Sequence, residues 1–397
     1  MCPLNPPHIV IVGGGPAGLS TALHLREVVP QATVTVLERD HYPRDKHCAG
    51  AIGGRALPLL ERLGVDLASD VPSVSIDRFV VHMGGGTIES RQPGCSRVIR
   101  RIELDHALAK RAQAAGVDLR QGCAVRTLTP STRGVQLELD GSEPIRADLV
   151  VGADGIGGTV RRALGIARGS LRAQAIEVDT VRTDADLPTD TIHFAFDEGL
   201  RGYRWDFPTP MDGKIMMSRG VYLMRDQRGG PGPKALLAAH LARHGLRIED
   251  HRLKQLAERG FDPRAPIAVP RVLLVGEAAG IDFPTGEGIA QALLGGEIAA
   301  RYLARAIARD DLGFLDWRRT LLTSAEGRFL HLRWWCGRLL FGAARRPIER
   351  ALRDSPGVLS VALQRFAGTD ISRMSVMRAV GQLAPALVRH AISAART

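Results

Sequence analysis

Three glycines near the amino terminus have the spacing of a pyrophosphate-binding turn. Gly13, Gly15 and Gly18 form a GxGxxG pattern between a β-branched run at 8–12 and a stretch of helical spacing at 16–28. In such a turn the first glycine permits a tight bend, the second lets a pyrophosphate approach the backbone, and the third lets the helix pack closely on the strand. The amino terminus of the helix then faces the anion. The pattern predicts a dinucleotide-binding fold.

Acidic residues follow the other predicted strands of the same fold. The second predicted strand ends in Glu38, at the distance from the glycines where a carboxylate can bond a ribose 2′-hydroxyl. A buried strand at 149–151 breaks into the turn that holds Asp154. A third strand breaks into Gly276-Glu277, ahead of a glycine-rich loop and a long apolar helix predicted from Glu287 onward. These three ordered motifs indicate one nucleotide-binding unit built from separate segments.

Together the motifs resemble the glutathione-reductase-type FAD proteins, in the branch that holds aromatic hydroxylases, flavin halogenases and geranylgeranyl reductases. The resemblance implies an α/β fold: a Rossmann-like FAD-binding domain, an inserted antiparallel-sheet substrate domain and a helical carboxyl-terminal region. The cofactor-binding residues that it implies are Gly13, Gly15, Gly18, Glu38, Arg39, Arg101, Val125, Asp154, Gly276, Glu277, Gly286, Gly288 and Ile289. The family normally has Gly-Asp at the third motif, so Glu277 takes over an acceptor role towards the ribityl chain.

The segments between the motifs set the expected domain boundaries. The FAD-binding domain is expected at 1–71, 99–170 and 267–312, the substrate domain at 72–98 and 171–266, and the helical region at 313–397. Alternating patterns in the two insertions predict one antiparallel sheet over the flavin. Because no second GxGxxG follows a strand, electrons are expected from transiently bound NAD(P)H or from an external reduced donor, such as an electron-donor protein.

An aromatic strand is the first feature that distinguishes the branches of this family. Tyr203, Trp205 and Phe207 alternate, and alternate side chains of a strand share a face. The segment resembles the YxWxFP element of geranylgeranyl reductases, whose aromatic face lines an isoprenoid pocket. A GxG that follows in the family reads Ser-Arg-Gly here, beginning at Ser218. We expect the three aromatic residues to bind substrate, with a plain core face of the sheet as the alternative.

The segment 43–50 is the second such feature, and it resembles the reductases' loop of proline, basic residue and Cys-x-Gly beside the isoalloxazine. Its cysteine, Cys48, could place an alkene or relay the proton that accompanies hydride delivery. The alternative is a buried free cysteine that packs as a small hydrophobe. Besides Cys48, the candidate catalytic residues are His47 and Tyr203, which with a bound water are the expected proton sources.

The expected function is reduction of carbon–carbon double bonds in an isoprenoid or other long apolar substrate, with hydride from flavin N5 and a proton from a nearby acid or water. The alternative enzyme is a monooxygenase that hydroxylates an aromatic or polyketide-like natural product through a flavin C4a-hydroperoxide. A non-catalytic flavin- or lipid-binding module is the third possibility.

Charge and composition limit the classes of molecule that the protein is expected to bind. Lys+Arg 53 against Asp+Glu 42 gives a net charge of +11, almost all of it arginine. The arginines are scattered, and neither a recognition helix nor a stacking platform is present, which argues against nucleic acid. A local excess at 329–353 combines arginines with tryptophans. This segment either lies on an anionic membrane surface or caps the pocket with a solvated arginine face.

The cysteines and the amino terminus indicate the compartment. Five cysteines at wide spacing, with no CxxC pair, exclude a disulfide framework and a zinc site, so no metal is expected. The sequence shows no signal peptide and no apolar stretch approaching the ~20 residues of a membrane span. A cytoplasmic location is therefore expected, with peripheral contact at the inner face of the membrane as the alternative.

Overall fold

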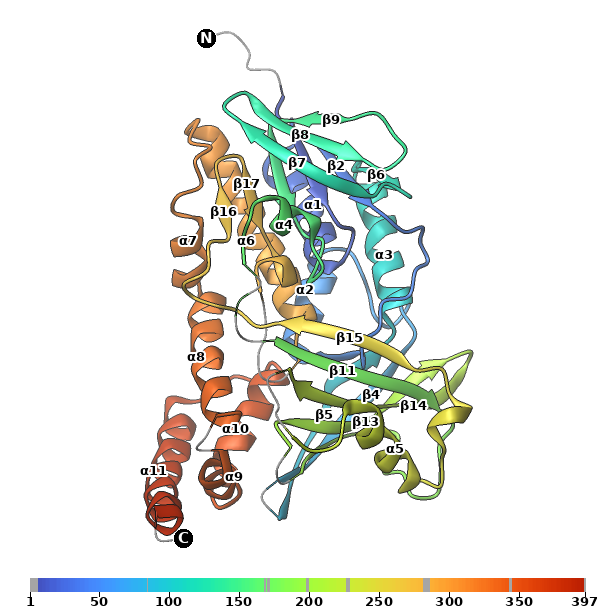
Figure 1. Ribbon diagram of the computed structural model, residues 1–397, viewed down its shortest axis with the longest axis vertical. Coiled ribbons are helices and arrows are strands. Elements are labelled where there is room, and N and C mark those ends of the chain that lie inside the picture. Colours follow the sequence, from blue (N-terminus) through green and yellow to red (C-terminus); the bar gives the residue numbers. More distant parts are fainter. Residues whose placement is uncertain are drawn as a thin grey trace.

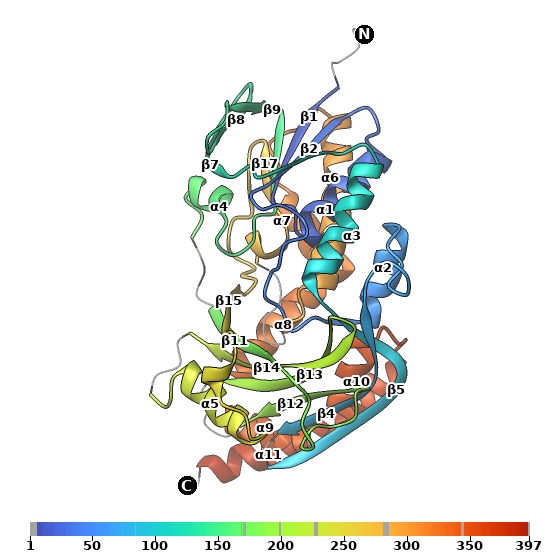
Figure 2. The same ribbon diagram turned by 90° about the vertical axis from the view of Figure 1, so that its right-hand side faces the viewer.

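The computed structural model describes residues 6–395 except for 84, 168, 170, 171, 198, 199, 226–228, 281–285, 343 and 344. Two sheets follow one another along the long axis of the molecule, and the last helices lie beside the second sheet (Figure 1). A quarter turn about this axis shows the same order of layers (Figure 2).

The first sheet is the predicted nucleotide-binding sheet. In spatial order its strands are β16 (Ala268–Val269), β17 (Val272–Leu274), β10 (Leu149–Gly152), β1 (His8–Val12), β2 (Thr33–Glu38) and β6 (Asp118–Gln121). All neighbouring pairs are parallel except β16 with β17. Strand β1 is β-branched after its first residue and is buried, as a central parallel strand covered on both faces requires.

Helices and a small sheet surround this layer. They are α1 (Pro16–Val28), α2 (Leu57–Arg62), α3 (Arg101–Ala114), α4 (Thr159–Ala163) and α6 (Ile289–Ala308), with the antiparallel sheet of β7 (Val125–Ser131), β8 (Gly134–Leu139) and β9 (Ile145–Ala147). Helices α1 and α6 pack closely, because a Cβ on Gly296 would lie 2.8 Å from the Cβ of Ser20. The long apolar helix begins at Ile289 and not at Glu287 as the sequence pattern predicts.

The second sheet has eight strands. In spatial order they are β15 (Lys254–Arg259), β11 (Arg172–Thr180), β14 (Lys214–Met224), β13 (Gly202–Met211), β12 (Thr191–Phe196), β4 (Ser73–Met83), β5 (Gly86–Ile99) and β3 (Ala51–Gly53). The expectation of a wholly antiparallel sheet is wrong at one place, since β12 and β4 pair in parallel. Asp190, just before β12, accepts backbone bonds from Asp77 and Arg78, so both strands start from the same end.

Strand β3 comes from a segment assigned by sequence to the FAD-binding domain. It pairs with β5 at the edge of the eight-stranded sheet and directly follows the loop that holds Cys48. The loop is therefore anchored to both sheets.

An ion-pair network holds α5 (Pro233–Ala242) on the outer face of the second sheet. Arg219 binds Asp206 at 2.8 Å and Asp186 at 2.7 Å, and His240 of α5 lies 3.0 Å from Asp206. The ligand atoms of Asp206, His240 and His244 lie within 4.8 Å of one another. Because the Arg219 guanidinium already neutralises Asp206 and would repel a metal cation, the cluster acts as an ion-pair network.

The last fifth of the chain is helical. It comprises α7 (Trp317–Thr323), α8 (Ala325–Leu340), α9 (Arg345–Arg353), α10 (Pro356–Phe366) and α11 (Arg373–Ala395). Within the described residues, no helix combines the length and apolar character needed to cross a membrane. The observed α/β architecture with this helical region confirms the predicted fold class.

Candidate functional site

A cavity of about 1480 Å³ extends from the glycine turn, across one face of the second sheet, to the carboxyl-terminal helices. Single-ligand pockets usually have volumes of about 300–1,000 Å³, so this one has room for a cofactor and a substrate together. The predicted site residues that line it are Gly13, Gly15, Glu38, Arg39, His47, Cys48, Arg101, Val125, Asp154, Tyr203, Trp205, Phe207, Glu277, Gly286, Gly288 and Ile289. Gly18 and Gly276 do not line the cavity; they let the chain behind its wall pack closely.

The glycine turn has the geometry of a pyrophosphate cradle. Gly13 has φ of 105°, which an L side chain rarely adopts. A Cβ on Gly18 would lie 2.0 Å from the Gly13 carbonyl oxygen, so only glycine lets α1 start this close to β1. Gly15 faces the cavity at the amino terminus of α1, where backbone N–H groups are free to bind an anion. These features fit a dinucleotide.

Arg44 and Asp105 hold Glu38 and Arg101 in place through ion pairs, which the sequence patterns did not reveal. The Glu38 carboxylate accepts from the backbone N–H of Gly14 at 2.8 Å and from Arg44 at 3.1 Å. Arg44 also binds Asp105 at 3.0 Å, and Asp105 binds Arg101 through two bonds of 2.7 Å. Arg44 thus connects the Cys48 loop to the nucleotide end of the cavity.

Asp154 and Glu277 lie on the cavity wall between the two sheets. One Asp154 oxygen accepts from Val160 N at 2.9 Å, while the other is buried and has no hydrogen-bond partner among the described residues. Burial raises the pKa of Asp154. Glu277 binds Lys46 of the Cys48 loop at 2.8 Å. The unsatisfied Asp154 oxygen could accept a hydrogen bond from a polar group of a bound cofactor. Glu277 still has a second carboxylate oxygen for the hydrogen bond expected from the ribityl chain.

The resemblance implies that backbone N–H groups of the loop 284–288 face the flavin. The structure describes this loop only from Gly286, so Pro284 and Thr285 lie outside the described residues. A Cβ on Gly286 would lie 2.8 Å from the Tyr203 hydroxyl oxygen, which places the aromatic strand against this loop. Glu287 is buried and binds Arg55 at 2.9 Å and Arg333 of α8 at 2.5 Å. A carboxylate at the start of α6 therefore fixes α8 over the cavity.

The predicted aromatic face is present. Tyr203, Trp205 and Phe207 line the cavity, whereas the residues between them point to the α5 network on the opposite face. Tyr203 stacks on Tyr222 with ring centroids 4.9 Å apart, and Phe194 packs edge-on against Phe207 at 5.1 Å. The partners come from β14 and β12 and extend the aromatic wall.

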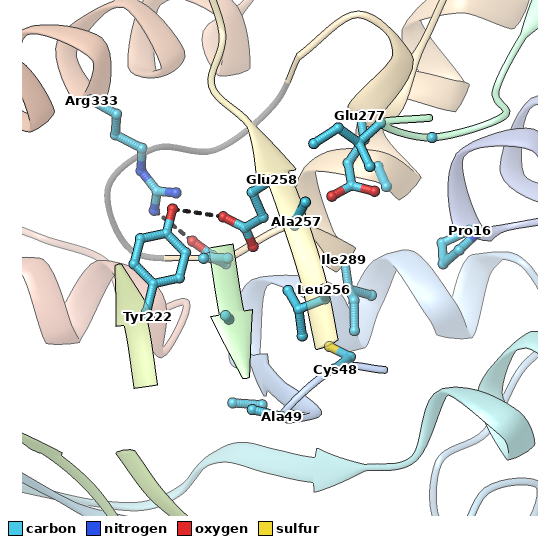
Figure 3. A pocket seen from close by; sticks show the side chains of 18 of the residues that line it. Pro16, Cys48, Ala49, Tyr222, Leu256, Ala257, Glu258, Glu277, Ile289 and Arg333 are labelled. Carbon is cyan, nitrogen blue, oxygen red and sulfur yellow. Dashed lines mark hydrogen bonds and ion pairs between the residues drawn. The ribbon is translucent and has the colours of Figure 1, made fainter. Parts of the chain in front are cut away.

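One carboxylate stands in this wall. Tyr222 donates a hydrogen bond to Glu258 of β15 at 2.8 Å, and both side chains face the cavity near Leu256 and Ala257 (Figure 3). Sequence reasoning missed both residues. No local pattern in 214–224 singled out Tyr222; the pairing of β13 with β14 places it opposite Tyr203.

Cys48 and His47 lie at the edge of the same wall. Burial raises the pKa of the Cys48 thiol, while the Arg101 guanidinium partly offsets this, so the thiol is protonated at neutral pH. Burial lowers the pKa of His47, so its ring is neutral at that pH. Cys48, Ala49 and Ile289 all line the cavity (Figure 3).

Behind Cys48 lies a buried acid, Glu177, that the sequence patterns also missed. Burial raises its pKa from 4.5 to about 7, although Lys254 and the backbone amide of Cys48 lower it. The Trp205 indole donates to Ser218 Oγ at 3.3 Å, and Ser218 donates to Glu177 at 3.5 Å. The Ser218 hydroxyl therefore connects the aromatic wall to this acid.

Comparisons with known proteins agree with this geometry. The model of the FAD binding domain family matches residues 7–293. Digeranylgeranylglycerophospholipid reductase 2 of Methanopyrus kandleri is 30% identical over 328 residues, covering 76% of this chain and 78% of the relative. Menaquinone reductase of Mycolicibacterium smegmatis is 28% identical, with 74% and 76% covered. Rifampicin monooxygenase of Streptomyces venezuelae is 26% identical, with 70% and 60% covered.

A solved structure shares the whole architecture. The geranylgeranyl bacteriochlorophyll reductase-like protein of Thermoplasma acidophilum superposes with a TM-score of 0.76 at 20% identity, covering 97% of this chain and 98% of the other. The family match, the relative in M. kandleri and the glycine cradle agree. The chain belongs to the geranylgeranyl reductase-like family of FAD-dependent oxidoreductases.

Proposed function

We propose that this enzyme reduces carbon–carbon double bonds in an isoprenoid or other long apolar chain. The observation that carries the proposal is the continuity of the cavity. It begins at the glycine cradle, passes Cys48 and the aromatic wall, and continues between α8, α10 and α11 over apolar side chains such as Leu359 and Leu387. An extended apolar molecule lying in the distal part would present its inner end to the cofactor region.

The residues of the cradle would hold FAD, which once reduced would supply the hydride. The N–H groups at Gly15 receive the pyrophosphate, Glu38 and Arg101 bind the nucleotide end, and Glu277 accepts from the ribityl chain. We infer that electrons reach the cofactor from NAD(P)H or another external reduced donor.

The aromatic wall positions the substrate and excludes water. Tyr203, Trp205 and Phe207 are each at most 5% exposed, so they offer flat apolar surface on the cavity side and no route to solvent. Aromatic rings pack well against alkene chains and lose little conformational entropy in doing so.

Each reduced double bond takes up a proton as well as a hydride. The Cys48 thiol is protonated and lines the cavity, which makes it the proton donor that we favour over His47, since the ring of His47 is neutral. Glu177, with a pKa of about 7, lies behind Cys48 and can take up and release a proton near neutral pH.

The similarity to rifampicin monooxygenase supports the rival function, oxygen insertion into an aromatic or polyketide-like product. Anaerobic turnover separates the two. The FAD-loaded enzyme, reduced with dithionite and mixed with a geranylgeranyl lipid without oxygen, is expected to yield products heavier by the mass of two hydrogens per double bond. A product that forms only in the presence of oxygen, and that contains one oxygen atom more than the substrate, would contradict the proposed reductase activity.

A further inference from the structure

The carboxyl-terminal helices concentrate the positive charge of the chain. Residues 324–397 contain 12 arginines and no lysine against 4 carboxylates, which gives +8 of the total +11. Arg333 and Arg345 are bound inside the protein, to Glu287 and Glu349. The exposed arginines of these helices are Arg328, Arg338, Arg346, Arg350, Arg373, Arg378 and Arg389.

The same helices expose most of the large apolar side chains on the molecular surface. Twelve large hydrophobic residues are exposed among those described, and eight of them lie on α8 and α11. They are Leu332, Trp335, Leu339, Met374, Val376, Met377, Val380 and Val388. Met374, Met377 and Val380 recur every three residues and so lie along one side of α11. Exposed apolar side chains that gather on two helices of a charged surface mark an interaction site.

The cavity opens onto this patch. Leu332 and Leu339 line the cavity and are also 55% and 52% exposed, so its apolar wall continues onto the outer surface. Leu383 and Leu387 of α11 line the cavity from the other side. Helices α8 and α11 lie on the same side of the molecule, the left side in Figure 1.

We propose that α8 and α11 form a membrane-docking surface through which an apolar substrate passes from an anionic bilayer into the cavity. This rests on the proposed function, because only a long apolar substrate needs such an entrance. Arginines beside exposed aromatic and aliphatic side chains are the combination that holds helices at an anionic lipid surface. A second copy of the chain would bring the same positive charge to the contact and would be repelled.

The surface only partly coincides with 329–353, the segment that the sequence left open as either a membrane contact or a cap on the pocket. The stretch 329–353 includes Arg333 and Arg345, which point inward, and α8 caps the cavity with one face while exposing the other. The strongest apolar exposure lies further along the chain on α11, where Met377 is 74% exposed.

Vesicle flotation tests the surface directly. The full-length, FAD-loaded protein is mixed with vesicles of phosphatidylcholine alone or with added phosphatidylglycerol, at low and high salt. Binding is expected only with phosphatidylglycerol and should weaken with salt, because the attraction is partly electrostatic. The double variant Met377→Glu, Val380→Glu should lower the bound fraction about tenfold, since it removes apolar contact and adds negative charge.

Val181→Glu with Ile215→Glu is the matched control, because these residues are also exposed, 56% and 41%, but lie outside α8 and α11, directly after β11 and in β14. Flotation of the control should equal that of the parent protein. Absence of binding to either vesicle, equal loss in the control, or a dimer that Met377→Glu disrupts while vesicles do not bind would each overturn the proposal.

An assay of alkene reduction with substrate dispersed in detergent tests the proposed function independently of the membrane-docking surface. Turnover in detergent without vesicle binding refutes the surface alone. Vesicle binding without alkene reduction refutes the function alone.

Discussion

Cys48, which lines the cavity, and Glu177, which is buried behind it, are neighbouring acids, and each influences the pKa of the other. The negative charge of Glu177 is one cause of the raised pKa of Cys48, and the backbone amide of Cys48 stabilises the Glu177 carboxylate. A carboxyl group with a pKa near neutrality, adjacent to a cofactor cavity, is typical of a functional site.

Glu177 should make the protein less stable as pH rises. Its pKa is 4.5 as a free group and about 7 when folded, so the folded state binds the proton more tightly. The resulting stability is present in full below the lower value and is lost as pH rises through about 7, by roughly 3 kcal/mol in all. Unfolding free energies measured from about pH 5 to pH 9 should fall less steeply for Glu177→Gln. Parallel curves for the two proteins would show that Glu177 is not the titrating group.

Replacement of Cys48 should separate cofactor binding from chemistry. In Cys48→Ala the FAD content should be unchanged, because the glycine cradle is intact, while turnover should fall about 100-fold if the thiol supplies the proton. Cys95→Ala is the control, since Cys95 is buried in the sheet but does not line the cavity. If Cys48→Ala loses FAD, as measured by flavin absorbance, then Cys48 supports cofactor binding and the assigned position of its loop beside the substrate is wrong.

At the scale of elements, β13 and β14 set the shape of the substrate wall. Trp205 and Gly220 are direct partners in the two strands, and the indole lies over the glycine. A Cβ on Gly220 would lie 2.0 Å from the Trp205 ring. The glycine therefore keeps the tryptophan flat against the sheet and the cavity open.

Gly220→Ala should tilt the Trp205 ring into the cavity. We expect a loss of about 1–3 kcal/mol in the free energy of unfolding from overpacking, and a rise in KM for substrate with FAD affinity retained. Gly232→Ala is the matched control, because a Cβ on Gly232 would meet nothing within 4 Å. If Gly220→Ala weakens the binding of substrate and of FAD equally, the aromatic wall has only a structural role.

Helices α6 and α8 are joined by Glu287, and its removal should loosen the cap. Glu287→Gln leaves the cations of Arg55 and Arg333 without their buried counterion, which should cost about 3 kcal/mol of stability. Glu297→Gln, within α6, is the control, since its partners Arg62 and Arg301 are half exposed or more and such pairs are worth about 1 kcal/mol or less. Chemical denaturation compares the two variants.

The sequence predicted those features that depend on local spacing. The GxGxxG turn and the one-sided aromatic strand follow from periodicities of a few residues, and both are present as predicted. Tyr222, Glu177 and Glu258 reach the site only through the pairing of strands, which spacing within one strand does not reveal. For the segment that contains Arg333 the sequence left two roles open, a membrane contact or a cap with a solvated arginine face, because nothing local shows that Glu287 binds Arg333.

For the whole molecule, one cavity connects chemistry at one end to an apolar surface at the other. The nucleotide-binding sheet contributes the cradle, the second sheet the aromatic wall, and the last helices the distal half. Of the net charge of +11, +8 lies on residues 324–397 of the carboxyl-terminal helices.

The central claim is that electrons pass from the reduced cofactor to an alkene held in this cavity. A single-turnover experiment tests it: the enzyme is reduced without oxygen, mixed with a polyprenyl lipid, and followed by the return of the yellow absorbance of oxidised flavin. We predict that the colour returns in proportion to the double bonds reduced, and that a fully saturated lipid gives none. Flavin that stays reduced with the polyprenyl lipid until oxygen is admitted would contradict the account.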